Sequence, residues 1–160
     1  MNLKNRLFWV TAAVGLVLDQ LSKFAIVQNF QIGETLALIP GVFHFTYVVN
    51  KGAAFSLFSE RGEWLRWLSL IVSAGLILLA WRTRMNRLEQ VGYGCVLAGA
   101  LGNGIDRFTA GQVVDFLDLR IIRFAVFNLA DVFINIGIFC LLVAAFQQPP
   151  RKDSRHTADK

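Results

Sequence analysis

Hydrophobic residues fill four long stretches of the chain, and polar residues collect in the connections between them. The stretches cover residues 7–28, 64–81, 89–105 and 128–146. At a rise of about 1.5 Å per residue, the first stretch forms a helix roughly 33 Å long, enough to cross the hydrocarbon core of a bilayer. The pattern therefore predicts a single integral membrane domain, residues 1–160, built on a bundle of four transmembrane helices.

The third stretch is richer in small residues than the others. Gly94, Ala98 and Gly102 recur every four positions, so they share one face of the expected helix. Small residues at this spacing let two membrane helices approach each other closely. We expect this face to serve packing rather than catalysis, and we expect the helix to close at Asp106 and Arg107.

The two long connections follow other patterns. After the turn at Pro40 and Gly41, aromatic and β-branched residues alternate from Phe43 to Asn50, which predicts a strand. The second connection, residues 108–127, is too charged to cross a membrane and too apolar for a free loop. We expect strand or interfacial structure there, packed on the membrane surface. The fold class is thus an all-α membrane protein with a small β element.

The ends of the chain are predicted from the same pattern. Lys4 and Arg6 precede the first stretch as they would in a secretory signal, but no small-residue cleavage site follows its apolar core. We therefore expect a retained helix. Pro149 and Pro150 end the fourth stretch, and the polar, basic tail of residues 147–160 is predicted to be disordered.

Composition and charge support a membrane protein and fix its orientation. Hydrophobic residues make up 55% of the chain and charged residues 17%, against about 25% charged in an ordinary soluble domain. The net charge of +5 comes with basic clusters that flank the stretches, which argues against a nucleic-acid partner. These clusters precede the first stretch, separate the second from the third, and follow the fourth. The positive-inside rule places them all, and both termini, in the cytoplasm.

Cysteine and histidine suggest neither a disulfide nor a metal site. Cys95 and Cys140 lie within apolar stretches, where inert buried thiols are the expected state. His44 and His156 are too few and too far apart for a usual zinc site. We predict no metal and no cofactor.

Acidic residues beside membrane-grade hydrophobic sequence are the candidates for chemistry, because such placements are costly. Asp115 lies inside the apolar run Val113–Phe116, and Asp131 lies where the fourth stretch begins. A helix dipole would favour the Asp131 anion, and this alone is the simpler explanation of that residue. The orientation brings Asp106, Asp115, Asp118 and Asp131 near the outer face. The partner of Asp131 stays open among the other three, although Asp115 has the most apolar neighbours.

Other polar residues near the stretches have simple explanations beside functional ones. Asp19 and Lys23 are four apart on one helical face and can pair, either within a site or as a neutralised pair whose lysine reaches toward the interface. Asn50 offers an amide that donates and accepts, and Gly52 permits close backbone approach, although a plain turn explains both.

Four classes of protein fit acids at a membrane face. Two carboxyls that share one proton can activate water to hydrolyse a peptide bond. A proton-coupled carrier is a second class, but its acids should lie near the middle of the membrane and no inverted repeat is visible. A membrane scaffold would use the small-residue faces and charge pairs for assembly alone. The GxGD type of intramembrane peptidase is approached by Gly102–Asp106, where the acid comes one residue too late.

Five motifs follow one another along the chain. They are LDQLSK at 18–23, NKGAAFS at 50–56, GALGNGIDR at 99–107, VVDF at 113–116 and FNLAD at 127–131. In this order they resemble the lipoprotein signal peptidases (signal peptidase II), the aspartic peptidases of the bacterial inner membrane. The resemblance covers residues 18–134, and the five motifs together are far more specific than any one of them.

The resemblance implies a catalytic dyad of Asp115 and Asp131. It implies that further residues shape the site or bind substrate: Asn50, Gly52, Asn103, Arg107 and Asn128, with Asp19 and Lys23 in support. The implied substrate is a prolipoprotein whose lipobox cysteine carries diacylglycerol, cut just before that cysteine. We expect a monomer in contact with membrane lipid, with its site near the outer face of the inner membrane. Which aspartate starts as the base is left open.

Overall fold

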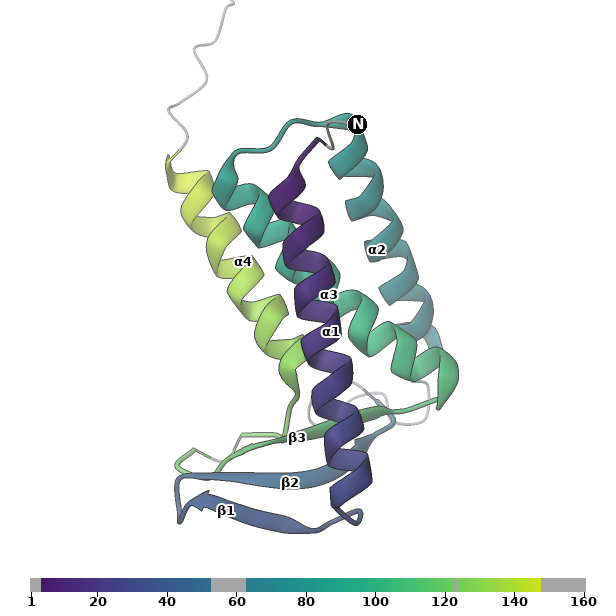
Figure 1. Ribbon diagram of the computed structural model, residues 1–160, viewed down its shortest axis with the longest axis vertical. Helices are drawn as coiled ribbons and strands as arrows, with labels where there is room; N and C mark the ends of the chain where they lie inside the picture. Colours follow the sequence, from purple (N-terminus) through teal and green to yellow (C-terminus); the bar gives the residue numbers. More distant parts are fainter. Residues whose placement is uncertain (1–3, 53–62, 123, 148–160) are drawn as a thin grey trace, which may run out of the picture.

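The computed structural model describes residues 4–52, 63–122 and 124–147, which form helices lying side by side and one small sheet at an end of the bundle (Figure 1). The elements in order are α1 (Arg6–Asn29), β1 (Thr35–Ile39), β2 (Phe43–Asn50), α2 (Glu63–Arg82), α3 (Arg87–Thr109), β3 (Val113–Leu119) and α4 (Leu129–Gln147). The mostly helical fold with a small β element is as predicted.

Three helices, α1, α2 and α4, are long and apolar enough to cross a membrane by length and composition. The remaining described helix, α3, does not meet that standard, because glycines and polar side chains lower its hydropathy. The fourth transmembrane span therefore stays a prediction.

The four predicted helices appear within a few residues of their expected bounds, except for the end of α3. The prediction that Asp106 and Arg107 close this helix is wrong, since it continues to Thr109. Both side chains turn toward partners in the interior instead of ending the helix. The chain leaves the helix at Ala110, and Gly111 then adopts a left-handed φ of 70°.

Helix α3 packs against all three other helices, and small residues permit this. The predicted packing face is confirmed and points to α1: a Cβ added at Gly94 would lie 2.8 Å from the carbonyl oxygen of Phe8. A Cβ built at Gly15 of α1 would lie 2.7 Å from the Cβ of Ala98. At Gly102, a Cβ would meet the carboxylate of Asp19.

Helices α3 and α4 are packed just as tightly along a second face. A Cβ added at Gly99 would meet the carbonyl oxygen of Ala130, in the first turn of α4. One added at Gly137 would lie 2.6 Å from the carbonyl oxygen of Gly92. The contact between Gly99 and Ala130 sets how closely the start of α4 approaches α3, and hence where Asp131 lies.

The antiparallel sheet has the order β1-β2-β3 and contacts the end of α1. The predicted strand at Phe43–Asn50 is confirmed as the central strand β2, and β3 supplies the strand expected in the second long connection. Ile26 of α1 packs with Tyr47 and Phe116 in a buried cluster beneath the sheet. The β2–β3 register pairs Val48 with Asp115, which brings the aspartate to this end of the bundle.

At the end of the bundle away from the sheet, Asn5 connects the start of the chain to the end of α2. Its Nδ2 donates to the carbonyl oxygens of Ala80 and Thr83, each at 2.8 Å, and its Oδ1 accepts from the N–H of Met85 at 3.1 Å. These bonds satisfy backbone groups that the end of α2 would otherwise leave unpaired.

Two smaller predictions concern the thiols and the tail. Cys95 and Cys140 are free thiols; Cys95 is buried as expected, whereas Cys140 is only partly buried. The predicted disorder of the tail falls on residues 148–160, which lie outside the described residues, while Gln147 still belongs to α4.

Candidate active site

One cavity of about 540 Å³ lies where α3, α4 and β3 meet. Most of the predicted site residues line it: Asn50, Gly52, Asn103, Arg107, Asp115, Asn128 and Asp131. Asp19 and Lys23 do not line the cavity; Lys23 contacts Asn103, which does, and Asp19 pairs with Lys23.

Asp131 is held by the start of its own helix. The N–H of Asp131 donates to Asn128 Oδ1 at 3.1 Å, and the N–H of Asn128 donates back to Asp131 Oδ2 at 3.2 Å. This reciprocal pair is a capping box, with Asn128 as the N-cap. The simpler explanation of Asp131 as a helix-terminal acid is therefore true but incomplete, because the same carboxylate also lines the cavity.

Asp115 lies on β3 and is only 3% exposed. Its Oδ1 accepts from Asn128 Nδ2 at 2.6 Å and its Oδ2 from Asn50 Nδ2 at 2.9 Å. Burial raises the pKa of Asp115 to about 6; the charge of Asp131 also raises it, while the bonds from Asn50 and Asn128 oppose the shift. This carboxyl is thus suited to carry a proton in mildly acidic solution.

Asn128 connects the two acids, because its side chain donates to Asp115 and its backbone N–H donates to Asp131. Of the three partners that the sequence left open for Asp131, the structure brings Asp115 to the same cavity. Asp118 instead accepts from Thr46 Oγ1 at 2.7 Å and pairs with Arg120 Nε at 2.9 Å, away from the cavity.

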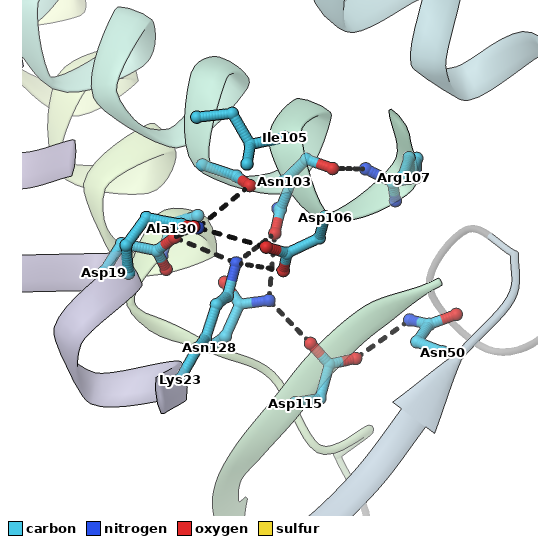
Figure 2. A network of polar contacts seen from close by, with 12 residues as sticks. Asp19, Lys23, Asn50, Asn103, Ile105, Asp106, Arg107, Asp115, Asn128 and Ala130 are labelled. Carbon is cyan, nitrogen blue, oxygen red and sulfur yellow. Dashed lines mark hydrogen bonds and ion pairs between the residues drawn. The ribbon is translucent and has the colours of Figure 1, made fainter. Parts of the chain in front are cut away.

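Lys23 occupies the interior beside the cavity, only 4% exposed. Its ammonium pairs with Asp19 Oδ2 at 2.9 Å and with Asp106 Oδ2 at 2.8 Å (Figure 2). The alternative of a lysine reaching toward the interface is therefore wrong, because acids from two helices surround it. Asp106, one of the partners left open for Asp131, forms its ion pair with Lys23 instead.

The remaining polar residues connect the ion cluster, formed by Asp19, Lys23 and Asp106, to the cavity. Asn103 Oδ1 accepts from Lys23 Nζ at 3.0 Å, and Asn103 Nδ2 donates to Asp131 Oδ1 at 2.9 Å. Arg107 donates to the carbonyl oxygen of Asn103 at 3.2 Å and to that of Gly52 at 3.5 Å. A cation therefore lines the cavity beside the two acids.

Several lining residues were missed by the sequence analysis. The apolar wall consists of Phe124, Ala125, Val126 and Phe127, with Val132 and Ile136 of α4 opposite. Phe127 bridges to Leu117 of β3, which explains the extended shape of this segment. Gln20 was also missed; its Nε2 donates to Asp106 Oδ1 at 3.1 Å. Only its place within LDQLSK hinted at a role.

The two carboxyls of the cavity, Asp115 and Asp131, can act together as an acid and a base. Two carboxyls joined by one asparagine share a cavity whose walls are largely apolar. Such a pair binds one proton more tightly than isolated acids do, so one member can act as a base and the other as an acid toward the same water.

Comparison with known proteins gives consistent matches. A family model described as signal peptidase (SPase) II matches residues 11–147. A lipoprotein signal peptidase from Nostoc sp. is 60% identical over 97% of this chain and 99% of its own length. One from Gloeothece citriformis is 64% identical over 95% of each. A solved bacterial membrane enzyme superimposes with a TM-score of 0.82 at 30% identity, covering 93% of both chains.

Proposed function

Because the chain belongs to the signal peptidase II family, and is thereby an aspartic peptidase of lipoprotein processing, we propose that Asp115 and Asp131 are its catalytic dyad. The substrate is a prolipoprotein already modified with diacylglycerol, and the cut falls just before the lipidated cysteine. The observation that carries the dyad is Asn128, whose side chain and backbone donate to the two acids in one cavity.

The two acids have different surroundings, which supports different roles. Asp131 lies in the first turn of α4, where the backbone N–H of Asn128 donates to its carboxylate and the helix dipole favours an anion. Asp115 is buried on a strand, and its pKa is raised to about 6. Asp131 is therefore the initial base and Asp115 the initial acid.

The reaction then follows from these protonation states. Asp131 takes a proton from a water held between the two carboxyls, and the resulting hydroxide attacks the scissile carbonyl carbon. Asp115 donates its proton to the carbonyl oxygen as the tetrahedral intermediate forms. Collapse of the intermediate breaks the C–N bond: Asp131 returns its proton to the amine nitrogen of the cysteine, and Asp115 takes back a proton from a hydroxyl of the intermediate as the carboxyl product forms. Arg107 and the asparagines orient the peptide and the acids.

The placement of the site explains the choice of substrate. The cavity lies at the end of the bundle that carries the sheet, and α1 begins at the other end (Figure 1). With α3 as a fourth span and the basic clusters in the cytoplasm, the cavity faces the outer leaflet of the bacterial inner membrane. A monomer in this orientation leaves the acyl chains of the substrate in the bilayer while the peptide enters the cavity.

The proposal is tested by incubating the purified protein with one lipobox precursor in two forms, lipidated and unlipidated, and measuring cleavage of each. We expect cleavage of the lipidated form alone, releasing a fragment that begins with the modified cysteine, as mass spectrometry would record. Cleavage of both forms at equal rates would remove the lipid requirement. Cleavage of neither would contradict the proposed substrate and cleavage site.

The pH dependence of kcat/KM tests the role of Asp115. Because the acid must carry its proton, kcat/KM should fall as pH rises through about 6. Asn50→Leu removes a donor that stabilises the Asp115 anion, so the pKa of Asp115 rises further and the decline moves roughly one unit to higher pH.

The matched control for this measurement is Asn29→Leu. Asn29 lies at the exposed end of α1 and donates to the carbonyl oxygen of Ala25, away from the cavity, so its replacement should leave the profile in place. A decline that stays fixed or moves to lower pH in Asn50→Leu contradicts the assignment of Asp115 as the acid.

A further inference from the structure

We propose that Lys23 is a positioning residue for the peptidase reaction: it fixes the direction of the Asn103 amide, so that Asn103 can only donate to Asp131. The inference rests on the proposed dyad and adds a role within it. Its evidence is the chain of contacts from the ion cluster of Asp19, Lys23 and Asp106 to the cavity (Figure 2).

The direction of an asparagine amide follows from its partners. A lysine ammonium has three donors and no acceptor, so the amide atom at 3.0 Å from Lys23 Nζ must be the oxygen. The other end of the same amide, the NH₂ group, then faces Asp131 Oδ1 at 2.9 Å. Asn128 Nδ2, at 3.0 Å from the Asn103 oxygen, supports the same direction.

Two further asparagines of the cavity, Asn50 and Asn128, obey the same rule with different anchors. The oxygen of Asn50 accepts from the N–H of Gly52 at 3.0 Å, and that of Asn128 accepts from the N–H of Asp131 at 3.1 Å. Both then present Nδ2 to Asp115. Backbone groups anchor these two amides, whereas Asn103 depends on a side chain from another helix. Of these three amides, that of Asn103 is therefore the one whose anchor a substitution can remove.

The ammonium is held in place from several sides. It lies 2.9 Å from Asp19 Oδ2, 2.8 Å from Asp106 Oδ2 and 3.0 Å from Asn103 Oδ1. Asp19 Oδ1 also accepts from the N–H of Ala130 at 2.8 Å, next to Asp131 in α4. The absence of a Cβ at Gly102 leaves room for the Asp19 carboxylate. The ion cluster thus fixes Lys23 relative to α3 and α4 at once.

Loss of the anchor should affect catalysis more than substrate binding. Without Lys23, the Asn103 oxygen keeps the bond from Asn128 but loses its charged donor, so the amide is held less firmly. The bond from Asn103 Nδ2 would then orient Asp131 less precisely toward the water. Hydrogen bonds to charged groups are worth enough to predict a roughly 10-fold fall in kcat with little change in KM.

The test is a double-mutant cycle in kcat. Lys23→Met alone would leave two buried acids without a cation, so the lysine is removed in the neutral-triad variant, Asp19→Asn with Lys23→Met and Asp106→Asn. We expect this variant to lose about 10-fold in kcat when Asn103 is present, and less than about 2-fold when Asn103→Ala is already in place. Equal losses in both backgrounds, or a loss confined to KM, would overturn the inference.

Two further variants keep the test decisive. Asn103→Asp retains Lys23 but places an acceptor against Asp131, so it should lower kcat more than Asn103→Ala does. An equal or smaller loss in kcat counts against the inference. This comparison can be made even if the neutral-triad variant does not fold. Asn5→Gly removes a buried polar contact at the other end of the bundle. It should lower Tm, leave kcat per folded enzyme unchanged, and show no coupling to Asn103.

The same assay separates this inference from the proposed dyad. If Asp115→Asn or Asp131→Asn keeps near-normal turnover, the dyad is wrong and this role falls with it. If both are inactive but the cycle is additive, the dyad stands and only the positioning role of Lys23 is lost.

Discussion

Asp131→Asn and Asp115→Asn should each lower kcat by about 10²- to 10⁴-fold, the range that a positioned acid or base contributes. An amide neither takes the proton of the water nor delivers one to the carbonyl oxygen. Each substitution also places an NH₂ group against an existing donor, Asn128 N in one case and an asparagine Nδ2 in the other. We therefore expect a loss of about 1–3 kcal/mol in stability, small enough for insertion to persist.

The measurement is single-turnover cleavage of a lipidated precursor, normalised to folded protein. Asp118→Asn is the matched control, because Asp118 lies on the same strand but bonds to Thr46 and Arg120 outside the cavity. It should retain full activity. Substantial turnover by either dyad variant, or inactivity of Asp118→Asn, would contradict the assignment.

Gly99→Ala should disable the enzyme from a position that touches no substrate. The added methyl group would meet the carbonyl oxygen of Ala130, so α3 and the start of α4 must separate. Overpacking of this kind costs about 1–3 kcal/mol. It also displaces Asp131, and a misplacement of about 1 Å at a catalytic group can cost roughly 10²-fold in rate. Both Tm and kcat should fall.

Gly75→Ala is the control for that experiment. Gly75 lies in α2, and a Cβ built there meets nothing within 4 Å. The same chemical change should therefore leave Tm and kcat at or slightly above their original values. If the two alanine variants behave alike, the close contact between α3 and α4 does not position the site.

The sequence predicted the elements and the candidate acids better than the contacts between them. Alternation from Phe43 to Asn50 located β2, and the family motifs pointed to Asp115 beside Asp131. Physical reasoning alone left Asp106 and Asp118 open as partners, because strand register and side-chain direction decide which acid reaches α4. Strand β1 was not predicted. All five of its residues are exposed, so no alternation of buried and exposed positions marks it as a strand.

Lys23 and α3 show why the remainder could not be predicted. The spacing of Asp19 and Lys23 indicated a pair, but the third member, Asp106, lies on another helix and completes the cluster only after packing. The end of α3 was misplaced for a related reason. Charged residues near a helix end usually face solvent, whereas Asp106 and Arg107 face the interior and let the helix continue.

The capping box at the start of α4 has a consequence for how this peptidase becomes active in the cell. Asp131 is oriented by the backbone N–H of Asn128, and the first turn of α4 exists in part because Asp131 caps it. If Asp131 is the base, as proposed, a newly inserted chain whose α4 has not yet formed lacks an oriented base, and proteolytic competence then depends on the folding of this helix.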